Sequence, residues 1–143
     1  MARIAVLQMT AGIDPGANAS TVCAAAIQAG GDGATMLFTP EMSGLLDSNR
    51  DRARTKIMRE EDDPVLAAVR DAAAKAGVWV SLGSLAIRGE DGGRFANRGF
   101  VIDAAGNIVA RYDKLHMFDV DLASGETWRE SNAYAPGDRK SVV

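Results

Sequence analysis

The sequence predicts an α/β fold built as one layered domain. Short apolar runs rich in β-branched residues alternate along the chain with segments of helical spacing, a pattern typical of strands and helices packed in layers. The 143 residues, 47% of them hydrophobic and 24% charged, suffice for one ordinary core. A glycine turn at Gly106 between two apolar runs adds a β-hairpin to the expected sheet.

Strands are expected in five apolar stretches. Their bounds are residues 3–9, 35–40, 78–87, 100–103 and 107–112. The first stretch, with the sequence RIAVLQM, lacks polar alternation, which is typical of a strand covered on both faces. The last two stretches flank Gly106, which we expect in the left-handed position of the hairpin turn.

The first helix is expected between the first two strands. Residues 14–16 are interpreted as a loop, Asn18 or Ser20 as the N-cap, and Gln28 as the approximate end. Cys23 then falls on the apolar face of this helix. We therefore expect Cys23 to act as a small core residue.

The second helix has clear boundary residues. Asp63 can cap it, Pro64 suits its first turn, and Gly77 supplies a left-handed stop. From residue 113 onward the chain is interpreted as loop, until residues 141–143, which resemble the opening of another strand.

Composition excludes several classes of protein. A net charge of −3 and a pI near 5.1 argue against a general nucleic-acid binder. No apolar run is long enough to predict a transmembrane helix. The sequence has one cysteine and one histidine, so we expect neither a metal site nor an internal disulfide, and the cysteine usage favours a cytoplasmic location.

A dense charged stretch lies between the two helices. Its cations are Arg50, Arg52, Arg54, Lys56 and Arg59, and residues 60–63 are all acidic. The simplest interpretation is a solvated segment with compensating charges. The alternative is a lid that lends a cation to an anionic substrate.

Glu41 is the first candidate for chemistry. It follows the second apolar run, at the strand end where open α/β sheets place ligand-binding groups. Between Phe38 and Met42 its carboxylate could be partly desolvated, which would suit a general base. An ordinary strand-end acid is the alternative.

Lys114 and Glu130 are the other candidates. Lys114, among apolar neighbours after the hairpin, could stabilise an oxyanion, or it could be a surface lysine. Glu130 could orient the lysine or the substrate, or it could pair with Arg129. His116 is interpreted as structural, and glycine-rich residues 30–33 precede a strand rather than opening a helix, which disfavours a nucleotide-binding module.

Three segments together resemble the nitrilase superfamily of carbon–nitrogen hydrolases. They are FTPEM at residues 38–42, NRGFVIDAAGNIVARYDKLHMFDVD at residues 97–121, and GETWRESNAYAPG at residues 125–137. The third segment is most similar to the branch that holds omega-amidases and deaminated glutathione amidases. The resemblance implies the N-terminal half of a four-layer α-β-β-α sandwich.

The resemblance also implies a Glu-Lys-Cys triad that hydrolyses a small carboxylate-bearing amide without a cofactor. Glu41 matches the general base, Lys114 the lysine that stabilises the tetrahedral intermediate, and Glu130 a second glutamate beside the triad. Residues that bind the substrate are not predicted. A homo-oligomer is expected for the full-length form.

The nucleophilic cysteine of the family is expected downstream of residues 136–138, and Cys23 on the first helix cannot replace it. We therefore interpret residues 1–143 as an incomplete carbon–nitrogen hydrolase domain that is inactive alone. The alternative is a non-catalytic remnant, or an interaction module, of the same fold.

Overall fold

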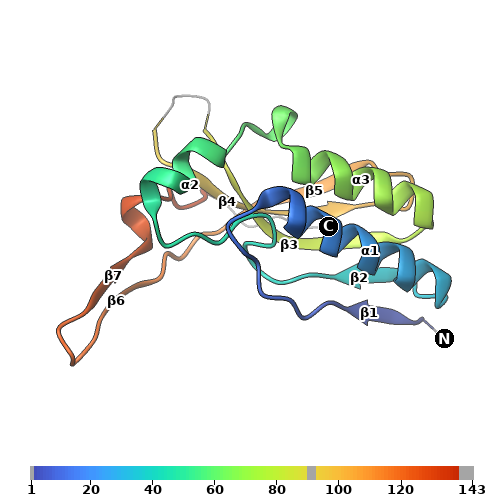
Figure 1. Cartoon of the computed structure of the whole chain (residues 1–143), viewed down its shortest axis with the longest axis horizontal. Helices are drawn as coiled ribbons and strands as arrows, with labels where there is room; N and C mark the ends of the chain where they lie inside the picture. The colour runs from blue at the N-terminus through green and yellow to red at the C-terminus, as the bar shows by residue number, and fades with distance from the viewer. Residues whose placement is uncertain (1, 90–92, 139–143) are drawn as a thin grey trace.

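The computed structural model describes residues 2–89 and 93–138. A five-stranded sheet forms one layer, and the two longest helices cover one of its faces (Figure 1). The α/β fold class predicted from the sequence is confirmed. In chain order the elements are β1 (Ile4–Val6), α1 (Pro15–Gly31), β2 (Met36–Phe38), α2 (Arg50–Lys56), η1 (Glu60–Asp62), α3 (Pro64–Ala76), β3 (Trp79–Ile87), β4 (Ala96–Ile102), β5 (Ile108–Asp113), β6 (Asp119–Asp121), β7 (Thr127–Arg129) and η2 (Glu130–Asn132).

The sheet is mixed, with the order β1-β2-β3-β4-β5. β1, β2 and β3 are parallel, and β4 and β5 are added as antiparallel strands. The connections agree with these directions, because α1 and α3 cross over between parallel neighbours, whereas a short turn at Gly106 joins β4 to the antiparallel β5. Gly106 adopts a φ of 83° in the β4–β5 turn, as the sequence predicts.

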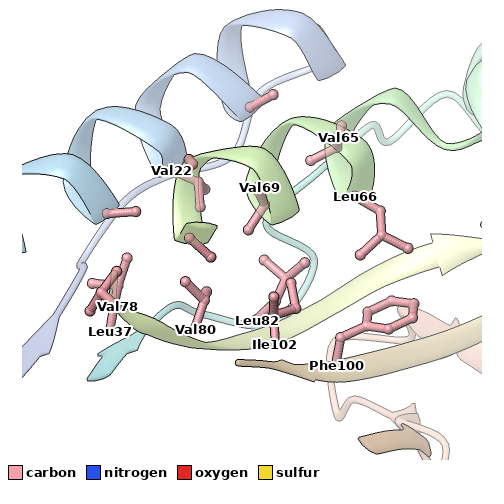
Figure 2. Close-up of a cluster of buried hydrophobic side chains, with 14 of the residues drawn as sticks. Val22, Leu37, Val65, Leu66, Val69, Val78, Val80, Leu82, Phe100 and Ile102 are labelled. Carbon is pink, nitrogen blue, oxygen red and sulfur yellow. The ribbon is translucent and has the colours of Figure 1, made fainter. Parts of the chain in front are cut away.

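The core lies between the helix layer and the sheet. Side chains of α1 and α3 point down onto the sheet, and Val22 and Val69 are fully buried there (Figure 2). Leu82, Phe100 and Ile102 meet them from β3 and β4. Burial of this apolar surface is the main force that holds the two layers together.

The boundaries of α3 follow the prediction. The Asp63 carboxylate accepts a hydrogen bond from the Leu66 N–H at 2.8 Å, and Gly77 ends the helix with a φ of 62°. In the described part of the chain, no helix has the length and apolar character needed to cross a membrane.

The predicted start of α1 is wrong. The helix begins at Pro15, and Asp14 caps it by accepting hydrogen bonds from the Gly16 and Ala17 N–H groups. Asp14-Pro15 is therefore a cap and first turn, as Asp63-Pro64 is in α3, rather than a loop. Asn18, predicted as a cap, is instead buried and bonds the Gly12 and Gly44 carbonyls.

The prediction that β1 is buried on both faces is also wrong. Ile4 is 60% exposed and Val6 is 74% exposed. β1 is an edge strand, and the helices cover only one face of the sheet. Phe38, Trp79 and Val109 are exposed apolar side chains on other strands of this sheet.

The interpretation of residues 113–138 as loop is wrong in part. β6 and β7 form a short antiparallel hairpin, and Gly125 turns between them with a φ of 89°. Each strand has only three residues and is largely exposed, so it carries no apolar periodicity. Residues 141–143, expected to begin a strand, lie outside the described residues.

Candidate active site

Glu41 lies three residues after the end of β2, in a segment held tightly against β3. The Met42 N–H donates to Ser84 Oγ at 2.9 Å, and the Ser43 N–H donates to the Ser84 carbonyl at 3.0 Å. Met42 adopts a φ of 56°, which L-residues rarely do. Gly83 of β3 allows this close approach, because a Cβ there would lie 2.4 Å from the Pro40 carbonyl oxygen.

Lys114 directly follows β5, and its side chain reaches the carboxylate of Glu41. Its ammonium group donates to Glu41 Oε1 at 2.8 Å and to Glu130 Oε2 at 3.0 Å. Its own backbone is fixed by a hydrogen bond from its N–H to the Asn97 carbonyl at 2.9 Å. The structure thus brings together the three residues singled out from the sequence, and their catalytic roles stay predictions.

Glu130 begins the short turn η2 and is held by three donors. The Phe118 N–H reaches Oε2 at 2.7 Å, Lys114 reaches the same oxygen, and the Asn97 amide reaches Oε1 at 3.1 Å. The alternative pairing with Arg129 is not observed, because the Arg129 guanidinium bonds Asp121 at 2.6 Å.

Asn97 is the member of the cluster that sequence reasoning missed. Its side-chain amide donates to Glu41 Oε1 at 2.7 Å and to Glu130 Oε1 at 3.1 Å, and the residue is only 3% exposed. Asn97 therefore fixes the spacing of the two carboxylates. No local signal marked it, because the strand predicted from the sequence began at Phe100, whereas β4 starts at Ala96.

We expect Asn97→Asp to destabilise the chain by about 1–3 kcal/mol at pH 7, because it places a third carboxylate against Glu41 and Glu130. The crowded acid should bind a proton more tightly when folded than when unfolded. The free energy of unfolding of the variant should therefore approach that of the wild type below about pH 4. The difference between the two should grow as pH rises. Urea unfolding at several pH values measures this difference.

Asn132→Asp is the matched control, because Asn132 lines the same cavity but is exposed. It should change the free energy of unfolding by no more than about 0.5 kcal/mol. Equal effects of the two substitutions would contradict the bridging role of Asn97.

The electrostatics favour a charged Lys114 beside an ionised Glu130. Partial burial lowers the pKa of Lys114, but its hydrogen bonds to Glu41 and Glu130 outweigh this effect and hold the pKa above its usual value. Partial burial raises the pKa of Glu130, but its hydrogen bonds from Phe118, Lys114 and Asn97 outweigh it and hold the pKa below its usual value. The expected desolvation of Glu41 is not seen, since its side chain is 56% exposed.

The cluster faces a cavity of about 500 Å³. Apolar and aromatic side chains make up much of its wall, and burial raises the pKa of one of them, Tyr134, to about 12. Its lining residues are Glu41, Met42, Leu45, Leu46, Asp47, Ser48, Arg50, Ala53, Arg54, Ile57, Phe95, Asn97, Lys114, Phe118, Trp128, Arg129, Glu130, Asn132, Ala133 and Tyr134. A second cavity of about 550 Å³ contains none of the three predicted site residues.

The other sequence candidates lie outside this cavity. Cys23 is partly buried on α1 and packs against the main core, where burial raises the pKa of its thiol, as does the nearby charge of Asp71. His116 is exposed and does not line the cavity. Within residues 2–89 and 93–138 no group of three or more side chains could hold a metal ion.

The charged stretch divides into two parts. Arg52 pairs with Asp47 at 2.6 Å, and Arg59 lies 3.9 Å from Glu61, as expected for a solvated segment with compensating charge. Arg50 and Arg54 instead line the cavity that contains Glu41. Whether this stretch acts as a lid stays a prediction.

Residues 3–143 match the sequence model of the Carbon-nitrogen hydrolase family. The chain belongs to this family. Among curated relatives, the chain is 33% identical to a deaminated glutathione amidase of Yersinia enterocolitica, over 99% of this chain and 50% of the relative. It is 30% identical to the human deaminated glutathione amidase, over 94% of this chain and 42% of that protein.

Solved structures of nitrilase-fold proteins also match the chain. The NitFhit protein of C. elegans superposes with a TM-score of 0.82 at 28% identity, over 96% of this chain and 34% of that one. The NitN amidase of Neterenkonia sp. AN1 superposes with a TM-score of 0.76 at 25% identity, over 97% of this chain and 51% of that one. The chain spans about half the length, or less, of these relatives. The predicted membership of the nitrilase superfamily and the corresponding half of its fold are confirmed.

Proposed function

We propose that this chain supplies the acid-base and oxyanion-stabilising groups of an enzyme that hydrolyses a small amide bearing a carboxylate. The observation that carries the proposal is the Lys114 ammonium held 2.8 Å from Glu41 and 3.0 Å from Glu130 at the wall of one cavity. Two relatives are named deaminated glutathione amidases, and a third is named an amidase, which supports an amide as substrate.

Glu41 is the general base in this proposal. It takes a proton from a cysteine thiol, and the thiolate attacks the amide carbon. The exposure of Glu41 to the cavity leaves its second oxygen free to approach this thiol, since the hydrogen bonds from Asn97 and Lys114 both end on Glu41 Oε1. The carbonyl oxygen becomes an oxyanion beside the Lys114 ammonium, which stabilises it as a fixed positive charge.

Collapse of the tetrahedral intermediate expels ammonia, with Glu41 returning its proton to the leaving nitrogen. Water then attacks the thioester, Glu41 accepts a proton from this water, and the carboxylic acid and the free thiol are released. Glu130 stays ionised throughout and holds Lys114 in place through the 3.0 Å ion pair.

The cysteine of this scheme comes from polypeptide outside the 143 residues. Cys23 is the one cysteine in the sequence, and it packs against the core on α1, away from the residues that line the cavity. By this proposal residues 1–143 are the part of a carbon–nitrogen hydrolase domain that lacks the nucleophile, and the chain alone is inactive. We further propose that the complete enzyme is a homo-oligomer.

A second candidate function is a non-catalytic interaction module. The specific observation in its favour is the exposed apolar surface of the sheet, where Val6 is 74% exposed and Trp79 is 40% exposed. Exposed apolar surface of this kind favours association. Sedimentation of the chain measures its association. A folded monomer at every concentration, with no partner bound, would argue against this candidate.

A chimera tests the enzymatic proposal. It replaces the matching half of the Yersinia enterocolitica deaminated glutathione amidase with residues 1–143. The chimera should release ammonia from succinamate, whereas the isolated chain should release none above the buffer blank. Turnover by the isolated chain at the rate of the chimera would contradict the missing-nucleophile proposal, and a folded but inactive chimera would contradict the assigned function.

A further inference from the structure

The strand β4 carries neighbouring side chains to two different cavities. Asn97 lines the cavity that contains Glu41 and Lys114, whereas Arg98 lines the second cavity, together with Leu66 of α3. Successive side chains of a strand point to opposite faces of its sheet, which explains this division. Arg98 is thus next to the candidate site in the chain but lies on the other face of the sheet.

Arg98 joins β4 to β5 through a bidentate ion pair with Asp113, its direct partner in the antiparallel register. Its Nε donates to Asp113 Oδ1 at 2.6 Å, and its Nη2 donates to Oδ2 at 2.9 Å. The two side chains are 27% and 30% exposed, so solvent screens this pair less than a fully exposed one. Two parallel hydrogen bonds also fix the relative orientation of a guanidinium and a carboxylate.

Glu60 of η1 fixes the guanidinium of Arg98 further. Arg98 Nη1 donates to Glu60 Oε2 at 2.9 Å, and Arg111 Nε donates to Glu60 Oε1 at 2.7 Å. The Glu60 side chain is only 18% exposed. Each of the three guanidinium nitrogens of Arg98 therefore has a carboxylate acceptor, which leaves the side chain little freedom to move.

Lys114 leaves the sheet at this ion pair. Its N–H donates to the Asn97 carbonyl at 2.9 Å, and its carbonyl accepts from the Gly137 N–H at 2.9 Å. After Lys114 the chain is irregular until β6 begins at Asp119. The end of a strand opens more readily than its centre. The ion pair at Asp113, one residue before Lys114, is therefore placed to keep this strand end closed.

We infer that Arg98 is a positioning residue for Lys114 and acts through its ion pair with Asp113. Opening of the strand end would lengthen the contacts of 2.8 and 3.0 Å that the Lys114 ammonium makes with Glu41 and Glu130. A small displacement of a group that stabilises the transition state lowers the rate of reaction. The effect on reaction rate rests on the proposed function, whereas the effect on the strand end does not.

Amide hydrogen exchange of the 143-residue chain, followed by NMR, tests the inference without turnover. Arg98→Met keeps much of the side-chain length and removes the charge. It should speed exchange of the Lys114 N–H by at least about tenfold. The Trp79 N–H, which donates to the Thr35 carbonyl at 3.0 Å, should keep its wild-type rate. Arg98→Lys keeps the charge but not the planar fork, so it should restore part of the protection.

Arg70→Met is the matched control. Arg70 lines the same cavity, but it donates to the Gly106 carbonyl in the turn that closes the other end of the β4–β5 hairpin. This variant should leave exchange at Lys114 unchanged. Unchanged exchange at Lys114 in Arg98→Met would overturn the inference. Equal acceleration of the Lys114 and Trp79 amides would also overturn it, because the substitution would then destabilise the whole fold.

The chimera separates this inference from the proposed function. In the chimera Arg98→Met should lower kcat for succinamate about tenfold and leave KM nearly unchanged, and Arg98→Lys should recover part of the loss. A folded but inactive parent chimera would refute the chemistry alone, and hydrogen exchange would still decide the role of Arg98. An active chimera with the same kcat after Arg98→Met would refute only the positioning role.

Discussion

Replacing Glu41 with glutamine in the chimera should lower the rate of ammonia release by at least about a thousandfold. Glutamine has nearly the same shape and can keep an oxygen near the Lys114 ammonium, which lies 2.8 Å from Glu41 Oε1. It cannot accept the thiol proton, so the nucleophile is not activated. The measurement is steady-state turnover of succinamate, with the fold checked by circular dichroism.

Glu61→Gln is the control for this substitution. Glu61 is 67% exposed in η1 and does not line the cavity, so its variant should keep the activity of the chimera. Retention of more than about a tenth of the activity by Glu41→Gln would show that another group acts as the base.

Truncating Phe100 to alanine should lower the free energy of unfolding by about 3–5 kcal/mol. Phe100 is 2% exposed and fills the space between β4 and α3 in the core (Figure 2). A domain of ordinary size is stable by only about 5–15 kcal/mol, so the variant should lose a large share of its stability. Urea denaturation of the 143-residue chain, followed by circular dichroism, measures the change.

Val109→Ala on the neighbouring strand β5 is the control. Val109 is 44% exposed, and its loss should cost no more than about 0.5 kcal/mol. A change of less than about 1 kcal/mol for Phe100→Ala would contradict the position of this ring in the core.

Local patterns in the sequence predicted much of the helix layer and the sheet. Asp63-Pro64 and Gly77 bound α3 because capping and left-handed geometry depend on a few neighbouring residues. The same reasoning, applied to Asp14-Pro15, would have placed the start of α1 correctly. The β6–β7 hairpin was missed because exposed three-residue strands show no apolar periodicity.

The candidate site was predicted only as separate residues. Glu41, Lys114 and Glu130 stood out through their motifs, but nothing local links positions so far apart in the chain. Asn97 was overlooked because an asparagine within a strand has no distinctive pattern until its two carboxylate partners are known. Likewise, the charges between residues 50 and 59 look alike in sequence, yet only Arg50 and Arg54 face the cavity.

The sequence by itself determined the fold class, the boundaries of α3, the β4–β5 turn and the residue types available for chemistry. These features depend on interactions within a few residues, or on an apolar pattern that repeats along one element. The tertiary structure alone decided which face of the sheet is covered, that one lysine bridges two glutamates, and which arginines share their cavity. Such contacts join segments far apart in the chain, 73 residues for Lys114 and Glu41, so they exist only once the strands have paired and the helices have packed.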